Sequence, residues 1–159
     1  MSEWAEFGRD LTEALRDVAD RVFLIVFLPA NPKVYVQFAG GQHEVEAQAA
    51  GPEVVPWADV SGMTEAGWVP PSGFDPPNWT FTLPVPALTA EYAALAQRCV
   101  VALRDVYQVS DPRGLVYKAW REGEWPAAAE SWSDERIATR DVGENPLEMR
   151  WLKIPPAQG

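Results

Sequence analysis

The sequence VFLIVFL, residues 22 to 28, decides the fold of this chain. Its seven apolar residues are mostly β-branched or aromatic, and the run is too short for a typical buried helix. Both alternating sets of side chains are apolar, which is typical of a strand covered on both faces. We therefore expect residues 22–28 to form the central strand of a sheet.

Alternating patterns on either side of this run predict three further strands. From Lys33 to Ala39, Val34, Val36 and Phe38 alternate with Tyr35 and Gln37, and Gly40-Gly41 then turns the chain. A third strand is expected from His43 to Ala49, with Glu44, Glu46 and Gln48 on its outward side. The segment Asn78 to Leu83 alternates in the same way and predicts the fourth strand.

Two amphipathic helices complete the pattern. In residues 3–19, apolar side chains recur every three or four residues (Trp4, Phe7, Leu11, Ala14, Leu15 and Val18), and Ser2 is a suitable N-cap. Thr89 is the expected N-cap of a second helix that extends to about Tyr107. These elements predict an α+β fold, with helices packed on one face of an antiparallel β-sheet.

Three other segments are less regular. Residues 51–86 hold eight of the 15 prolines, yet Trp57, Trp68, Phe74 and Trp79 indicate an ordered loop, with a short helix at residues 59–66. Leu115 to Arg121 fits a strand or a helical turn. Leu147 to Ile154 is predicted as an edge strand.

The charge distribution argues against polyanionic partners. The 23 acidic and 13 basic side chains give a net charge of -10, and no Lys or Arg lies between Lys33 and Arg98. Nucleic acids and acidic membranes are bound mainly through Lys and Arg, so we expect neither as a partner. There is also no apolar run of spanning length and no basic leader, and the chain has a single cysteine, so we expect a cytoplasmic protein.

No motif recommends catalysis, a metal or a cofactor. Cys99 and His43 are far apart in the sequence, and no metal-ligand spacing or glycine-rich nucleotide loop is present. Cys99 lies on the apolar side of the second helix, where a small buried thiol is the commoner role. Glu44 and Glu46 could form an acid–base couple, although a solvated strand face explains them as well. We expect a protein that is not an enzyme and has no cofactor.

The eight tryptophans exceed what one helix-on-sheet core is expected to enclose. Trp4, Trp68 and Trp79 are assigned to the core, and others to a surface that binds a protein. If helices cover the side with Val34, Val36 and Phe38, the opposite side carries an apolar ridge flanked by acids. That ridge suits a homodimer contact, a basic amphipathic segment of a partner protein, or the chain's own C-terminal stretch.

The predicted partner-binding residues are Phe23, Ile25 and Phe27, or their alternates in the first strand, together with Tyr35 and Gln37. An alternative hypothesis is a small-molecule-binding protein or cryptic enzyme. Its pocket would lie under the proline-rich loop, lined by Trp57, Trp68 and Trp79, near Glu44 or Glu46.

Several of these core and turn residues also form a familiar combination. The set comprises the helix with Trp4, Phe7, Leu11 and Leu15, the strand Tyr35-Val-Gln-Phe38, Gly67-Trp68 followed by prolines and Asn78-Trp79, and the helix end Leu103-Arg-Asp-Val-Tyr107. It resembles actinobacterial proteins of the YbjN and type III secretion chaperone-like group, the TY-Chap domains. The resemblance implies an α+β chaperone-like domain over residues 3–121 that binds segments of other proteins, performs no chemistry and is often dimeric in the secretion chaperones. Residues 122–159 are then a C-terminal extension, docked or partly flexible.

Overall fold

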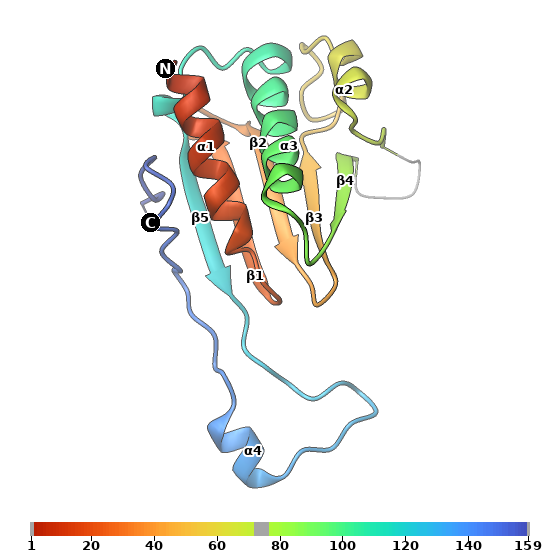
Figure 1. Cartoon of the computed structure of the whole chain (residues 1–159), viewed down its shortest axis with the longest axis vertical. Helices are drawn as coiled ribbons and strands as arrows, with labels where there is room; N and C mark the ends of the chain where they lie inside the picture. The colour runs from red at the N-terminus through yellow and green to blue at the C-terminus, as the bar shows by residue number, and fades with distance from the viewer. Residues whose placement is uncertain (1, 72–76, 159) are drawn as a thin grey trace.

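The strand over residues 22–28 is one of five that form a single antiparallel sheet in the computed structural model, which describes residues 2–71 and 77–158. The sheet order is β4-β3-β2-β1-β5 (Figure 1). The strands are β1 (Val22–Leu28), β2 (Asn31–Gly40), β3 (Glu44–Ala49), β4 (Trp79–Pro84) and β5 (Val116–Arg121). The four predicted strands are confirmed, and the ambiguous segment from Leu115 to Arg121 is a strand.

Helices pack on one face of this sheet, as predicted. They are α1 (Glu3–Arg16) and α3 (Thr89–Val100), which continues as the π-helical turn η1 (Val101–Val106) (Figure 1). Ser2 caps α1, because its Oγ accepts a hydrogen bond from the Ala5 N–H at 3.1 Å. The prediction of Thr89 as an N-cap is wrong. Leu88 holds that position, and the Glu91 carboxylate accepts a hydrogen bond from its N–H at 3.1 Å, so the helix begins without a capping hydroxyl.

The core lies between the helices and the sheet. Trp4, Trp68 and Trp79 are only 9%, 2% and 5% exposed, which confirms their assignment to the core. The expected short helix is α2 (Ser61–Ala66), and after it the Trp68 indole N–H donates to the Arg98 carbonyl oxygen of α3 at 3.2 Å. This part of the proline-rich segment is therefore an ordered loop packed on α3; Phe74 lies outside the described residues.

The expectation that β1 is central and covered on both faces is wrong. The central strand is β2, and β1 lies beside the edge strand β5. Leu24 and Val26 of β1 are fully buried under the helices, whereas Phe23, Ile25 and Phe27 are only half-buried on the other side. A strand that is apolar in both rows does not reveal whether a second layer covers it, and here the second row borders solvent.

The C-terminal part first leaves the domain and then returns to it. Residues 122–143 form an arm that carries α4 (Asp134–Thr139) and projects beyond the sheet (Figure 1). Residues 144–157 then run back beside β5. At its other end, β5 is preceded by the short 3₁₀ turn η2 (Pro112–Gly114). The predicted edge strand from Leu147 to Ile154 is wrong, because the chain turns at Arg150 and Trp151, and the isolated pairs with β5 form only at Glu144 and Pro156, on either side of this segment.

Candidate functional site

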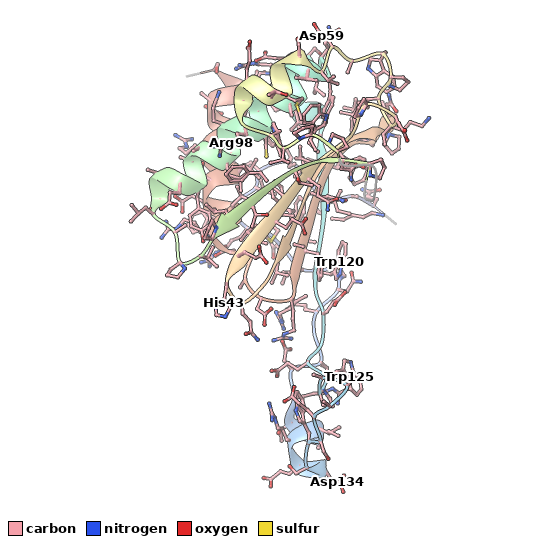
Figure 2. All side chains as sticks on the ribbon, turned by 90° about the vertical axis from the view of Figure 1, so that its right-hand side faces the viewer. His43, Asp59, Arg98, Trp120, Trp125 and Asp134 are labelled. Carbon is pink, nitrogen blue, oxygen red and sulfur yellow. The ribbon has the colours of Figure 1, made fainter. Side chains whose placement is uncertain are left out.

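The open face is the side of the sheet opposite α1 and α3, and it carries all five predicted partner-binding residues. Strand register places Phe27 beside Tyr35 and Ile25 beside Gln37, so these four side chains share one face with Phe23. The structure therefore selects the row that the sequence left open. Figure 2 shows the labelled Trp120 on this same side of the sheet, away from the helices.

Trp120 is a residue of the open face that sequence reasoning did not place. It lies on β5 directly opposite Phe23, and the two rings stack with centroids 5.3 Å apart and an angle of 11° between planes. Such a cross-strand aromatic pair stabilises a sheet and presents a flat apolar surface. The alternation of Val116, Lys118 and Trp120 along a strand would place Trp120 on this face. The same segment also fits a helical turn, so the sequence alone does not assign Trp120 to a face.

A hollow of about 230 Å³ opens beside this aromatic pair. Phe23, Ile25 and Trp120 line its apolar side, and Gln37, Glu46 and Gln48 line its polar side. Ala39 lies between the two sides, because β2 pairs it with Phe23 on one flank and with Glu46 on the other. A methyl group is too short to fill the space between an aromatic ring and a carboxylate, which explains the hollow.

A chain of hydrogen bonds fixes the polar side chains of the open face. The Tyr35 hydroxyl donates to Asn78 Oδ1 at 2.7 Å, and Asn78 Nδ2 donates to Gln48 Oε1 at 3.0 Å. Gln37 Nε2 donates to the same Gln48 oxygen at 2.8 Å. Partial burial raises the pKa of Tyr35, so its hydroxyl stays protonated near neutral pH. The network holds the amide groups in place without occupying the hollow.

The charges on the open face are unevenly distributed. Glu44 and Glu46 are exposed on β3, whereas β5 contributes Lys118 to this face, with its Nζ 6.0 Å from the Phe27 ring centroid. At the end of β5, Arg21 and Arg121 both contact the Asp141 carboxylate, at 3.1 and 2.7 Å, and they also lie 4.0 Å from Asp20 and 3.7 Å from Glu144, respectively, so three carboxylates face these two arginines. The end of the face that holds the hollow therefore presents negative charge.

The residues of the alternative pocket are not brought together. Trp68 and Trp79 are in the core on the helix side, and Trp57 is 53% exposed. Glu44 and Glu46 pair with Pro84 and Thr82 on the open face, so the sheet separates them from Trp79. This geometry does not favour a pocket lined by these five residues.

The two edges of the sheet carry additional pairing. At β5, Tyr117 exchanges hydrogen bonds with Pro155 and Ala157, and Arg121 exchanges two with Glu144. At β4, Thr80 exchanges two hydrogen bonds with Val69. Pro84 has no N–H and weakens the other end of β4 as a template for an added strand. Side chains of the open face are therefore more available to a partner than the backbone at either edge.

Cys99 and His43 do not form a reactive pair. Cys99 is fully buried within α3, and that burial raises the pKa of its thiol far above the usual value. His43 is exposed at the turn between β2 and β3, at the end of the sheet (Figure 2). Among residues 2–71 and 77–158, no group of three or more His, Cys, Asp or Glu is placed to hold a metal ion.

The fold and the open face together define a small α+β domain with helices on one side of a sheet and uncovered apolar side chains on the other. Residues 1–121 match the family model TY-Chap3, described as T3SS (YopN, CesT) and YbjN peptide-binding chaperone 3. The chain therefore belongs to the TY-Chap3 family and contains a peptide-binding chaperone-like domain, which confirms the resemblance found in the sequence. The match ends at the last residue of β5, so the arm and the returning segment lie beyond it.

Two other comparisons gave no match, either with curated proteins or with solved structures. Within the part of the chain that the structure describes, no helix has the length and apolar character needed to cross a membrane.

Proposed function

We propose that the open face binds a segment of a partner protein and that the chain acts as a chaperone-like module that catalyses no reaction. The observation that carries this proposal is the half-buried row of Phe23, Ile25 and Phe27, which borders a hollow outside the core. When a partner covers apolar side chains, the burial contributes about 25 cal/mol of favourable free energy for each Å² removed from water. The family match supports a peptide as the kind of partner.

The chemistry of the open face suits an extended or helical segment with a few apolar anchors. The aromatic pair of Phe23 and Trp120 offers a rigid apolar surface of the kind that dominates protein-binding hot spots. The amides of Gln37 and Gln48 lie beside it and can bond to the polar backbone of a bound segment. We propose no nucleic-acid or membrane role, because the face lacks the clustered cations that phosphates require.

A cytoplasmic site of action is also part of the proposal. Cys99 is a free, buried thiol, which is consistent with a reducing compartment. A second copy of the chain is another occupant that the same apolar row would accept, so the oligomeric state has to be measured together with peptide binding.

The test compares two variants that add the same charge at different places. Ile25→Asp puts a carboxylate into the open face, and Leu88→Asp puts one at a position that is 72% exposed on the helix side. Asp is favoured at an N-cap, so the second variant should fold normally. Circular dichroism and light scattering of both variants report their folding and their mass.

Peptides about a dozen residues long are selected from a random display library on the immobilised full chain, and their Kd values are measured by fluorescence polarisation. We expect Ile25→Asp to abolish binding and Leu88→Asp to leave Kd within about twofold. Equal binding by both variants, or the absence of any selected peptide, would contradict the proposal. A wild-type dimer that Ile25→Asp converts to a monomer would instead assign the face to self-association.

A further inference from the structure

We propose that the hollow beside Phe23 receives an arginine side chain of the bound protein segment. The inference rests on the proposed function and adds a chemical requirement to it: the partner segment carries an arginine next to its apolar anchors.

Four side chains lie in a fixed order across the open face of the sheet. Register places Trp120, Phe23, Ala39 and Glu46 in one row on the open face, each on a neighbouring strand. Trp120 stacks against Phe23, and both rings border the gap above Ala39, with Phe23 on the strand next to it. The backbones of β1 and β3 are two strand spacings apart, about 10 Å, which leaves room for a flat group between ring and carboxylate.

The two walls of the hollow have different chemistry, and a guanidinium group suits both. A guanidinium group is planar, stacks on aromatic rings and binds a carboxylate through two parallel N–H donors. The hollow offers the Phe23 ring on one side and the exposed Glu46 carboxylate on the other. Gln37 donates its amide N–H to Gln48, so its carbonyl oxygen remains able to accept a further hydrogen bond. A lysine ammonium would use the charge but not the flat stacking surface.

Within the described residues, the chain itself places an arginine over an aromatic ring at four other places, one of them the longer contact of Arg150 over Trp151 at 5.1 Å. The guanidinium carbon lies 3.9 Å from the ring centroid for Arg98 over Phe81, 3.8 Å for Arg136 over Trp132, and 3.9 Å for Arg140 over Trp125. Each of these rings has its own arginine, whereas Phe23 is stacked by Trp120 on one side and borders the hollow on the other. The hollow thus offers the aromatic ring of such a contact, and a partner would supply the arginine.

The surrounding charges favour a cation in the hollow. Arg21 and Arg121, at the same end of the sheet, are balanced by three carboxylates, those of Asp141, Asp20 and Glu144, and Lys118 lies near the Phe27 ring. Glu46 belongs to a segment of 64 residues, 34 to 97, that contains no Lys or Arg. A guanidinium therefore meets an excess of negative charge at this site.

The experiment uses peptides selected on the full chain from the random display library, each remade with every arginine replaced in turn by citrulline, which has the same shape and no charge. The protein variants are Glu46→Gln, Glu44→Gln and Phe23→Leu. Glu44→Gln is the matched control, because it removes the same charge from the same strand at a residue that does not line the hollow. Phe23→Leu removes the aromatic face and keeps an apolar side chain. Kd is measured at low and high salt.

We expect the selected peptides to share an arginine. Glu46→Gln should raise their Kd at least about tenfold, as is typical of the loss of a charge-assisted hydrogen bond. Glu44→Gln should change Kd less than about twofold, Phe23→Leu should weaken binding severalfold, and the citrulline peptide should be insensitive to Glu46→Gln. Peptides that bind in an Ile25-dependent manner but share no arginine, or that respond equally to both glutamate variants, would overturn this inference and leave the proposed function standing. Peptides whose Kd is unchanged by Ile25→Asp would overturn both this inference and the proposed function.

Discussion

Two neighbouring residues of β1 offer a direct test that one face of the sheet is covered and the other is open. Leu24 is fully buried under the helices, and Ile25 is half-buried on the open face. Truncation of a buried leucine to alanine costs about 2–5 kcal/mol, because transfer and cavity terms add. The same truncation at a half-buried site loses only part of the transfer term, about 1 kcal/mol.

The loss of strand propensity in alanine is larger for the β-branched isoleucine than for leucine, but the whole scale spans only about 1 kcal/mol, so this term does not reverse the order of the two variants. For a domain of this size, 1 kcal/mol corresponds to roughly 2–4 °C in Tm. We therefore expect Leu24→Ala to lower Tm by roughly 5–15 °C and Ile25→Ala by about 2–4 °C. The measurement is urea and thermal unfolding followed by tryptophan fluorescence, repeated at two protein concentrations tenfold apart. Equal losses for the two variants, or a Tm that rises with protein concentration, would show that another surface covers Ile25 in solution and would refute the open face.

Three further predictions follow from contacts away from the open face. Gly40→Ala should destabilise the fold strongly in urea unfolding, because its Cβ would lie 1.9 Å from the Ala19 carbonyl oxygen, whereas Gly41→Ala, with its nearest atom at 3.5 Å, should be tolerated. Hydrogen bonds from an arginine and a backbone N–H hold the pKa of Asp141 below its usual value, so its stabilisation of the arm is present above about pH 4 and is lost as pH falls through the lowered pKa. Backbone NMR shifts of the arm should report that acid transition, and Asp141→Asn should abolish it; an unchanged transition would contradict this role. Because Cys99 is fully buried with a raised pKa, a thiol reagent should label it at the rate of unfolding, and rapid labelling of the native protein would contradict that burial.

Sequence patterns predicted those elements whose side chains alternate between core and solvent. α1 and β4 have one apolar and one polar side, so their positions followed directly from the spacing. The segment from Leu115 to Arg121 was ambiguous, because its apolar residues fit two periods at once. Pairing of this segment with β1 settles the choice, and that contact joins residues about a hundred positions apart, beyond the reach of any local pattern.

The candidate site was predicted in part, for a related reason. Tyr35 and Gln37 were placed correctly because Val34, Val36 and Phe38 define the other side of β2. β1 has no polar row, so only its register with β2 shows that Phe23, Ile25 and Phe27 face outward. The stacking of Phe23 on Trp120 depends on a second register, between β1 and β5. The hollow depends on the small side chain of Ala39, which lies between two larger neighbours.

The returning segment, residues 144–157, explains why binding at the open face is energetically favoured over binding at the β5 edge of the sheet. A partner strand added at β5 would have to replace the hydrogen bonds of Tyr117 and Arg121 with residues 144–157 and expose Met149 and Leu152, which are 3% and 6% exposed. Uncovering two such side chains costs roughly 3–6 kcal/mol, equivalent to at least a hundredfold in Kd. A segment on the open face displaces no part of the chain that the structure describes there, so its binding does not carry this additional cost. The proposed recognition of side chains, in which Glu46 and Phe23 select a cation, is therefore favoured over strand addition while the returning segment stays in place.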